Sequence, residues 1–144
     1  MAFFSWLFAS PDPEARRRLE TAVADIDREL AANLELTSMF DQTHQFVVLE
    51  NGEFVRHGPT IQSGVSAAYG ALADLYARIP ATEAAMERRG PANTLRADDR
   101  LLIETWEGDA RTAQRALREA LATPPDSGLS ALVKRLRGML ASRR

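Results

Sequence analysis

Hydrophobic residues recur with the spacing of an α-helix along most of the chain. The segment Ser10-Pro11-Asp12-Pro13 has the residue types that begin a helix, a capping Ser or Asp and a proline in the first turn. After it, one apolar stripe at spacings of three and four residues is formed by Leu19, Val23, Ile26, Leu30 and Leu34. We therefore predict a first helix over residues from about 13 to 45.

Beyond this stripe the apolar positions move to another helical face. The residues on the new face are Leu36, Met39, Phe40 and Val47. The helix therefore either changes its packing partner or breaks near Asn33. The old stripe is continued by polar residues, among them Asp41 and His44.

Residues 46–57 fit two structures. Asn51-Gly52 between apolar pairs is a strong signal for the turn of a small β-hairpin. Alternatively, the first helix continues to about Leu49 and is followed by a loop over about 50–59. We favour the helix and loop, because an isolated two-stranded hairpin is only marginally stable.

The rest of the chain predicts three more helices, over about 60–79, 95–122 and 128–142. Prolines and Gly90-Pro91 separate these helices. Trp106 falls on the apolar stripe of the helix over 95–122, as a core residue would. Short connections between four helices are typical of an antiparallel bundle, so the predicted fold class is all-α. Residues 11–144 would form a single domain with a basic C-terminal helix, preceded by an aromatic segment over 1–10.

Composition excludes several kinds of site. The chain of 144 residues has no cysteine, which excludes disulfides, thiolate metal sites and a cysteine nucleophile. It contains no phosphate-binding glycine motif and no zinc-protease or hydrolase motif. We expect a non-enzymatic protein without a cofactor or a metal.

Charge is distributed unevenly, although the formal net charge is only −2. Residues 11–50 carry four Arg against nine acidic residues, whereas 129–144 carry four Arg and one Lys with no acid. In an alternating bundle both chain ends lie at one end, together with the end of the second helix and the start of the third. We therefore expect one basic end that includes Arg16, Arg17, Arg18, Arg88, Arg89 and Arg96.

The two chain termini suggest a docking function. The aromatic segment is too short to span a bilayer, which takes roughly 20 residues in a helix. Exposed apolar residues beside a basic surface suit an anionic membrane or a partner protein. The predicted docking residues are Phe3, Phe4, Trp6, Leu7, Phe8, Lys134, Arg135, Arg137, Arg143 and Arg144.

This docking hypothesis predicts a cytoplasmic protein that associates peripherally with a membrane or with a partner. The simpler alternatives are that the aromatic segment caps the bundle and that the basic helix only buries its leucine stripe. A homo-oligomeric adaptor without lipid contact is another alternative. Nucleic acid is not an expected partner, because the basic tail has no aromatic residue to stack on a base and the rest of the chain is acidic.

Asp41 and His44 form a candidate polar site, since Asp-x-x-His places both side chains on one helical face. A di-iron bundle needs this motif on two helices, and the other histidine, His57, has Phe54 three residues before it, so we exclude that site. A sensor or enzyme site at Asp41 and His44, with Tyr69, is the alternative function. The acidic residues of 95–122 are expected to face solvent in pairs with arginines.

Overall fold

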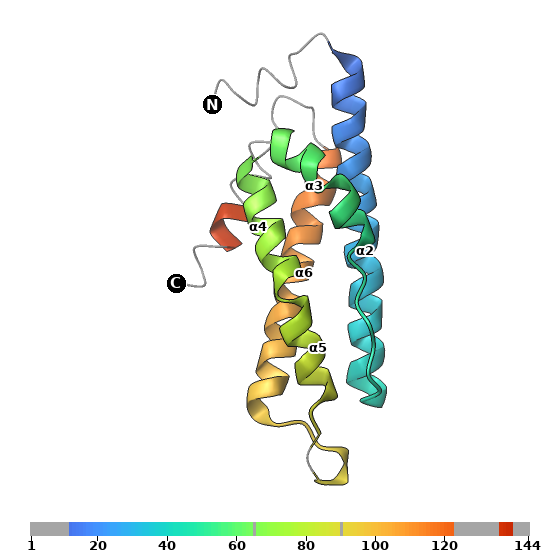
Figure 1. Cartoon of the computed structure of the whole chain (residues 1–144), viewed down its shortest axis with the longest axis vertical. Helices are drawn as coiled ribbons and strands as arrows, with labels where there is room; N and C mark the ends of the chain where they lie inside the picture. The colour runs from blue at the N-terminus through green and yellow to red at the C-terminus, as the bar shows by residue number, and fades with distance from the viewer. Residues whose placement is uncertain (1–11, 65, 90, 123–135, 140–144) are drawn as a thin grey trace.

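The computed structural model describes residues 12–64, 66–89, 91–122 and 136–139. The elements along the chain are α2 (Pro13–Thr43), α3 (Gly52–Gly64), α4 (Ser66–Ala77), α5 (Ile79–Glu87), the 3-10 turn η1 (Pro91–Asn93) and α6 (Ala97–Ala122). No strand occurs in these ranges. The helices pack against one another as a bundle (Figure 1), which confirms the predicted all-α class.

The first predicted helix is correct to within two residues. Asp12 caps α2 by accepting hydrogen bonds from the Glu14 and Ala15 amides at 3.0 and 3.4 Å, and Pro13 follows in the first turn. The helix ends where His44 adopts a left-handed conformation with φ 55° and donates its backbone N–H to Phe40 O. Since α2 is continuous through Asn33, the shift of its apolar stripe marks a change of packing partner.

Residues 44–51, which we call the return segment, form neither the hairpin nor the helical extension that we considered. They have no regular secondary structure and run back along α2 (Figure 1). The Asn33 side chain pairs with both backbone groups of Glu50, donating from Nδ2 to Glu50 O at 2.8 Å and accepting from Glu50 N at 2.7 Å. This pairing fixes the end of the return segment against the middle of α2.

A helix then begins at Gly52, where we expected a loop over about 50–59. The Glu29 carboxylate on α2 accepts hydrogen bonds from the Glu53 and Phe54 amides at 2.7 and 3.1 Å. A carboxylate at a helix N-terminus satisfies amides that lack partners within the helix and interacts favourably with its dipole. The cap comes from another helix, so no local signal in 46–57 indicates it.

The predicted helix over 60–79 is wrong in its boundaries. α3 contains Pro59 and ends at Gly64, and the chain reverses before α4 begins at Ser66. The return segment and α3 thus run antiparallel to α2, α4 and α5 run back together, and α6 completes the alternation (Figure 1).

This course of the chain corrects the expected basic end. The turn between α5 and α6 lies beside the C-terminus of α2, where Arg89 Nη2 donates to His44 O at 2.6 Å. Arg88 lies at this end too, donating from Nε and Nη2 to Asp99 Oδ1 at 3.0 and 2.7 Å. Arg88, Arg89 and Arg96 are therefore at the opposite end of the molecule from Arg16, Arg17 and Arg18, because the second rod starts with the return segment rather than with residue 60.

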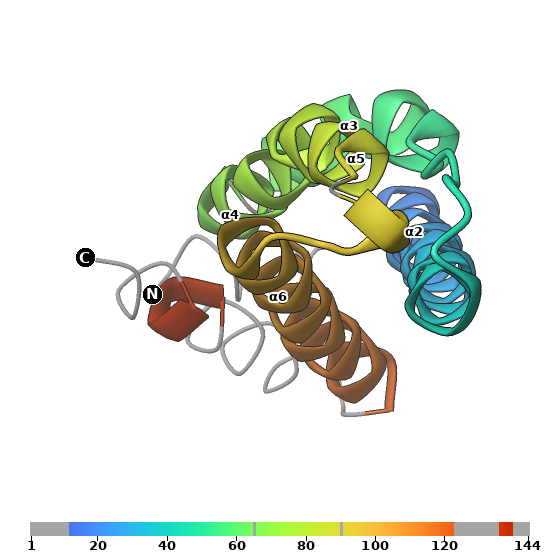
Figure 2. The same ribbon diagram turned by 90° about the horizontal axis from the view of Figure 1, so that it is seen from below.

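The apolar side chains form two clusters. The larger one lies between α2, α4 and α6 and contains Trp106, fully buried as predicted, whose indole N–H donates to Leu75 O at 2.9 Å. The smaller one, Phe40, Ala85, Met86 and Ile103, occupies the end where α2 stops. The view along the bundle shows α2, α6 and the α3–α5 segments around a common interior (Figure 2).

The last two predicted helices are described to different extents. α6 agrees with the prediction of 95–122 to within two residues. Of 128–142, only residues 136–139 are described; they are helical, and Leu136 and Met139 are buried in the larger cluster. The remainder of that prediction and the aromatic segment 1–10 lie outside the described residues.

We expect Asn33→Ala to lower the free energy of unfolding by about 1–3 kcal/mol, because it leaves two backbone groups of Glu50 without their partner. Urea denaturation measures this loss, and hydrogen exchange of the Glu50 amide should accelerate. Gln42→Ala, which removes an exposed amide from the same helix, is the matched control and should change the stability by less than about 0.5 kcal/mol. Equal effects of the two substitutions would contradict this account of the return segment.

Candidate functional site

A row of polar residues at four-residue intervals runs along α2, and we call it the polar row. It consists of Asp25, Glu29, Asn33, Thr37 and Asp41. The first four are buried, each with 6% or less of its surface exposed. Since four residues turn a helix by about 40° beyond a full turn, the row moves around α2 from the side of α3 to the side of α6. Buried polar groups require partners, and the two ends of the row form the two candidate sites.

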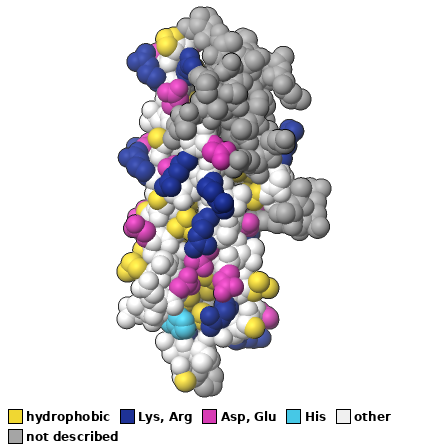
Figure 3. Space-filling view, turned by 180° about the vertical axis from the view of Figure 1, so that it is seen from behind, with side chains coloured by type: hydrophobic (Ala, Val, Ile, Leu, Met, Phe, Trp, Pro, Cys, Tyr) yellow, Lys and Arg dark blue, Asp and Glu magenta, His cyan; other side chains and the backbone are white. Residues whose placement is uncertain are grey.

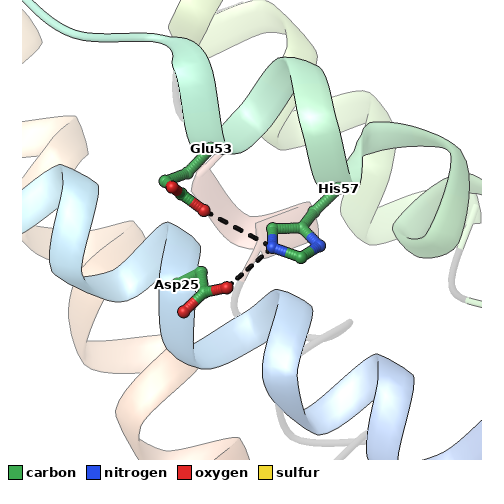
Figure 4. Close-up of side chains that lie close together, drawn as sticks. All are labelled: Asp25, Glu53 and His57. Carbon is green, nitrogen blue, oxygen red and sulfur yellow. Dashed lines mark hydrogen bonds and ion pairs between the residues drawn. The ribbon is translucent and has the colours of Figure 1, made fainter.

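At one end, Asp25 lies beside two residues of α3 (Figure 4). Its Oδ2 is 2.8 Å from His57 Nε2, and Glu53 Oε2 is 3.4 Å from the same nitrogen. We call these three residues the Asp25–Glu53–His57 cluster. Glu53 and His57 are one turn apart on α3, so both side chains project toward α2.

Arginines surround this cluster. Arg56 Nη2 donates to Glu53 Oε2 at 2.7 Å and to Asp25 Oδ2 at 3.1 Å, and Arg28 also pairs with Asp25. The Asp25 side chain is only 8% exposed, whereas those of Arg56 and Arg28 are 63% and 74% exposed. The cluster therefore holds a nearly buried carboxylate whose cationic partners reach it from solvent.

A cavity of about 340 Å³ adjoins the cluster through His57. Its other lining residues are Glu14, Arg17, Arg18 and Thr21 of α2 and Thr60 of α3. Arg18 pairs with Glu14 at 3.6 Å across one turn, and both side chains remain mostly exposed. The cavity combines guanidinium and hydroxyl groups, which bind anions, with the Glu14 carboxylate, which offsets part of their positive charge.

At the other end of the polar row, Asp41 lies beside Glu107 of α6. Glu107 is only 3% exposed. Burial, followed by the adjacent Asp41 carboxylate, raises the pKa of Glu107 to about 7, although Thr37 and Arg111 oppose this shift. Two close carboxylates do not both ionise readily, so this pair holds a proton at pH values where isolated carboxylates have lost it.

A second cavity, of about 270 Å³, contains both residues of the predicted polar site. Asp41 and His44 line it together with Arg100 and Glu104 of α6. Seen from behind, Asp and Glu side chains gather near a histidine toward the lower end of the molecule, below a band of Lys and Arg side chains (Figure 3).

Asp41 and His44 share this cavity, although His44 lies at the end of α2 and not within the helix as the Asp-x-x-His spacing assumed. His44 is the left-handed residue that ends α2; its ring stacks on Phe40 at 5.7 Å between centroids, and its Nδ1 is 3.3 Å from Asn93 O. Tyr69 does not join this site, since it stacks on Phe54 at the other end of the polar row. The C-terminal end of α2 and residues of α6 thus form this cavity together.

The predicted docking residues fall almost entirely outside the described part of the chain. Arg137 alone is described, and it is exposed. The other members are Phe3, Phe4, Trp6, Leu7, Phe8, Lys134, Arg135, Arg143 and Arg144, whose placement the structure does not describe.

Two features were not predicted from the sequence. We considered only a carboxylate three residues before His57, whereas Glu53 lies four residues before it and the third member, Asp25, comes from α2. We also expected the acidic residues of α6 to face solvent, although Asp99 and Glu107 are buried. Polar residues at every fourth position beside the apolar stripe of α2 were the available signal for both sites.

No protein-family model matches the chain, and comparisons with curated proteins and with solved structures find no significant similarity. No helix in the described part of the chain is both long enough and apolar enough to cross a membrane.

The carboxylate pair predicts a pH dependence of stability. Because the folded-state pKa of Glu107 is about 7, above its ordinary 4.5, the folded protein keeps a proton that the unfolded chain has released between these pH values. This contribution is fully present below pH ~4.5 and is lost as the pH rises through about 7. We expect the free energy of unfolding, relative to Glu107→Gln, to fall by about 2–3 kcal/mol between pH ~5 and ~8.

Urea unfolding at four pH values across this range measures the difference. Glu104→Gln, which neutralises an exposed carboxylate on the same helix, is the matched control and should keep the wild-type profile. Parallel profiles for the wild type and Glu107→Gln would show that Glu107 does not hold the proton.

Proposed function

We propose that this chain is a non-enzymatic docking protein that binds an anionic membrane surface through the end of the bundle at which α2 begins. One observation carries the proposal: the first turn of α2 and the last turn of α6 lie at the same end of the molecule (Figure 1). The aromatic residues 3–8 directly precede α2, and the acid-free segment 129–144 follows α6 after a short connection.

Covalent geometry supports this arrangement. A chain spans at most roughly 3.5 Å per residue, so a segment that ends four residues before Asp12 is tethered close to the first turn of α2. The first turns of α2 also carry Arg16, Arg17 and Arg18, with the Arg18 side chain 62% exposed. Apolar insertion and attraction to anionic lipid add, so neither has to be strong by itself.

The acidic residues of this end limit the strength of the attraction. Arg16 pairs with Glu20 at 3.7 Å and Arg18 pairs with Glu14 at 3.6 Å, which offsets part of the positive charge. Exposed pairs of this kind are worth only about 0–1 kcal/mol, so an anionic surface competes with them readily. We therefore infer reversible binding that depends on ionic strength.

Co-sedimentation with phosphatidylcholine vesicles containing roughly a third phosphatidylserine tests the proposal. We expect the full chain to pellet at low salt and a chain lacking residues 1–9 to lose at least tenfold in apparent affinity, because its insertion residues are gone. Arg17→Gln/Arg18→Gln should lose about thirtyfold, at roughly 1 kcal/mol per arginine near the surface. Arg96→Gln/Arg100→Gln, the same charge change at the opposite end, is the matched control and should bind like the wild type.

Equal pelleting of the full chain and of the chain lacking residues 1–9 would overturn the proposal. Equal pelleting on pure phosphatidylcholine would remove its electrostatic part. Failure of every variant to bind vesicles would contradict membrane docking and favour a protein as the partner of these residues.

We propose ligand binding in the cavity of Asp41 and His44 as a second candidate function. The observation that favours it is that this 270 Å³ cavity has carboxylates, Asp41 and Glu104, and a guanidinium, Arg100, in its lining. Opposite charges within one small cavity suit a zwitterion, with its ammonium group toward the acids and its carboxylate toward the arginine.

A thermal-shift screen of the free amino acids at neutral pH tests this candidate. We expect a stabilising amino acid whose effect is lost in Asp41→Asn and in Arg100→Gln, because each removes one half of the charge pairing. Arg96→Gln, one turn before Arg100 on an exposed position, should keep the full shift. The absence of any shift across the screen would contradict the candidate.

A further inference from the structure

The Asp25–Glu53–His57 cluster brings together three atoms of the kinds that bind divalent metals. A carboxylate oxygen of Asp25, one of Glu53 and a ring nitrogen of His57 all lie within 4.8 Å of one another, and Figure 4 shows the three side chains converging from α2 and α3. Among the described residues, no other group of three such side chains meets this criterion.

The spacing of these atoms suits a tetrahedral ion. Bonds of about 2.0–2.2 Å from zinc to carboxylate oxygen and imidazole nitrogen place neighbouring ligand atoms roughly 3.3 Å apart. His57 Nε2 is 3.4 Å from Glu53 Oε2 and 2.8 Å from Asp25 Oδ2, so small side-chain adjustments reach this geometry. The α3 backbone holds Glu53 and His57 one turn apart, and α2 supplies the third ligand, Asp25.

A cationic group already occupies the position between the two carboxylates. Arg56 Nη2 contacts Glu53 Oε2 and Asp25 Oδ2 at 2.7 and 3.1 Å, bridging the same oxygens that would bind an ion. Its side chain is 63% exposed, so it can move into solvent when another cation takes its place. Asp25, in contrast, is nearly buried; Arg28 stays paired with its Oδ1, and its Oδ2 is left for the metal.

We propose that Asp25, Glu53 and His57 bind a first-row divalent cation of the zinc class, with Arg56 as the group that the metal displaces. Carboxylate oxygens and an imidazole nitrogen are both ligands that Zn²⁺ binds in proteins. Three protein ligands leave a fourth position for water or an anion, as in zinc sites that are not purely structural. The adjoining cavity places Arg17 and Arg18, together with Glu14, beside His57.

This site is independent of the docking proposal, because its three ligands lie within the folded bundle and involve neither terminus. Metal binding would also link α2 to α3, adding to the contacts that the polar row makes with the return segment. A metal that binds only the folded state stabilises it, so added Zn²⁺ should raise the melting temperature.

Calorimetric titration of ZnCl₂ into the full chain without a polyhistidine tag tests the proposal. We expect one equivalent of Zn²⁺ to bind the wild type. His57→Gln should reduce the affinity at least tenfold, whereas His44→Gln, which replaces the other histidine, should bind like the wild type. Asp25→Asn should also weaken binding, with circular dichroism used to confirm that each variant is folded.

Arg56→Gln provides a test that does not depend on removing a ligand. Because this substitution removes the competing cation and keeps all three metal ligands, we expect the affinity for Zn²⁺ to rise by about tenfold or less. A purely structural ion-pair network would instead show no Zn²⁺ binding in any variant. That result, or equal losses in His57→Gln and His44→Gln, would overturn the proposal.

Discussion

The burial of polar groups on one side of α2 is the constraint on which the rest of the structure depends. A carboxylate and an amide removed from water need hydrogen-bond partners, and those of Glu29 and Asn33 find them in backbone groups of the segment that follows α2. The chain must therefore turn back beside the helix it has just completed. Asn33 meets Glu50, Glu29 meets Glu53, and Asp25 meets His57, which is the register of an antiparallel pair.

This register determines where the later elements lie. It ends the second rod near the start of α2, so α4 and α5 run the full length of the bundle and deliver the α5–α6 turn beside His44. The two candidate sites lie at the two ends of the polar row. Toward the start of α2, the row meets α3 and forms a carboxylate–imidazole cluster; toward the end of α2, it meets α6 and forms a carboxylate pair with a proton held near neutral pH.

The elements predicted correctly are those whose signals are local. α2 and α6 have apolar stripes of helical period, Asp12 and Pro13 begin the first of them, and Trp106 is buried where its stripe placed it. Residues 44–64 were predicted poorly because their structure depends on α2. Asn51-Gly52 suits a hairpin turn or a helix end by itself, yet here it precedes a helix whose first amides are capped by Glu29.

The candidate sites show the same division. Asp41 and His44 do share a cavity, but residues of α6 complete it, and the raised pKa of Glu107 depends on burial against a helix more than sixty residues away in the sequence. Glu53 and His57 are one turn apart and could have been paired from their spacing. Asp25 could not have been added to them, because no local pattern brings α2 to that face of α3.

The sequence alone determined the helical class, the bounds of the two long helices and the identity of the main core side chains, since period, capping and propensity act over a few residues. Only the tertiary structure decided the path of residues 44–64, the ends at which the arginines gather and the partners of the polar row. Those features depend on which buried polar side chain of α2 pairs with which group of a segment distant in the sequence. A buried polar group without a hydrogen-bond partner costs free energy, and this cost favours one register over the others.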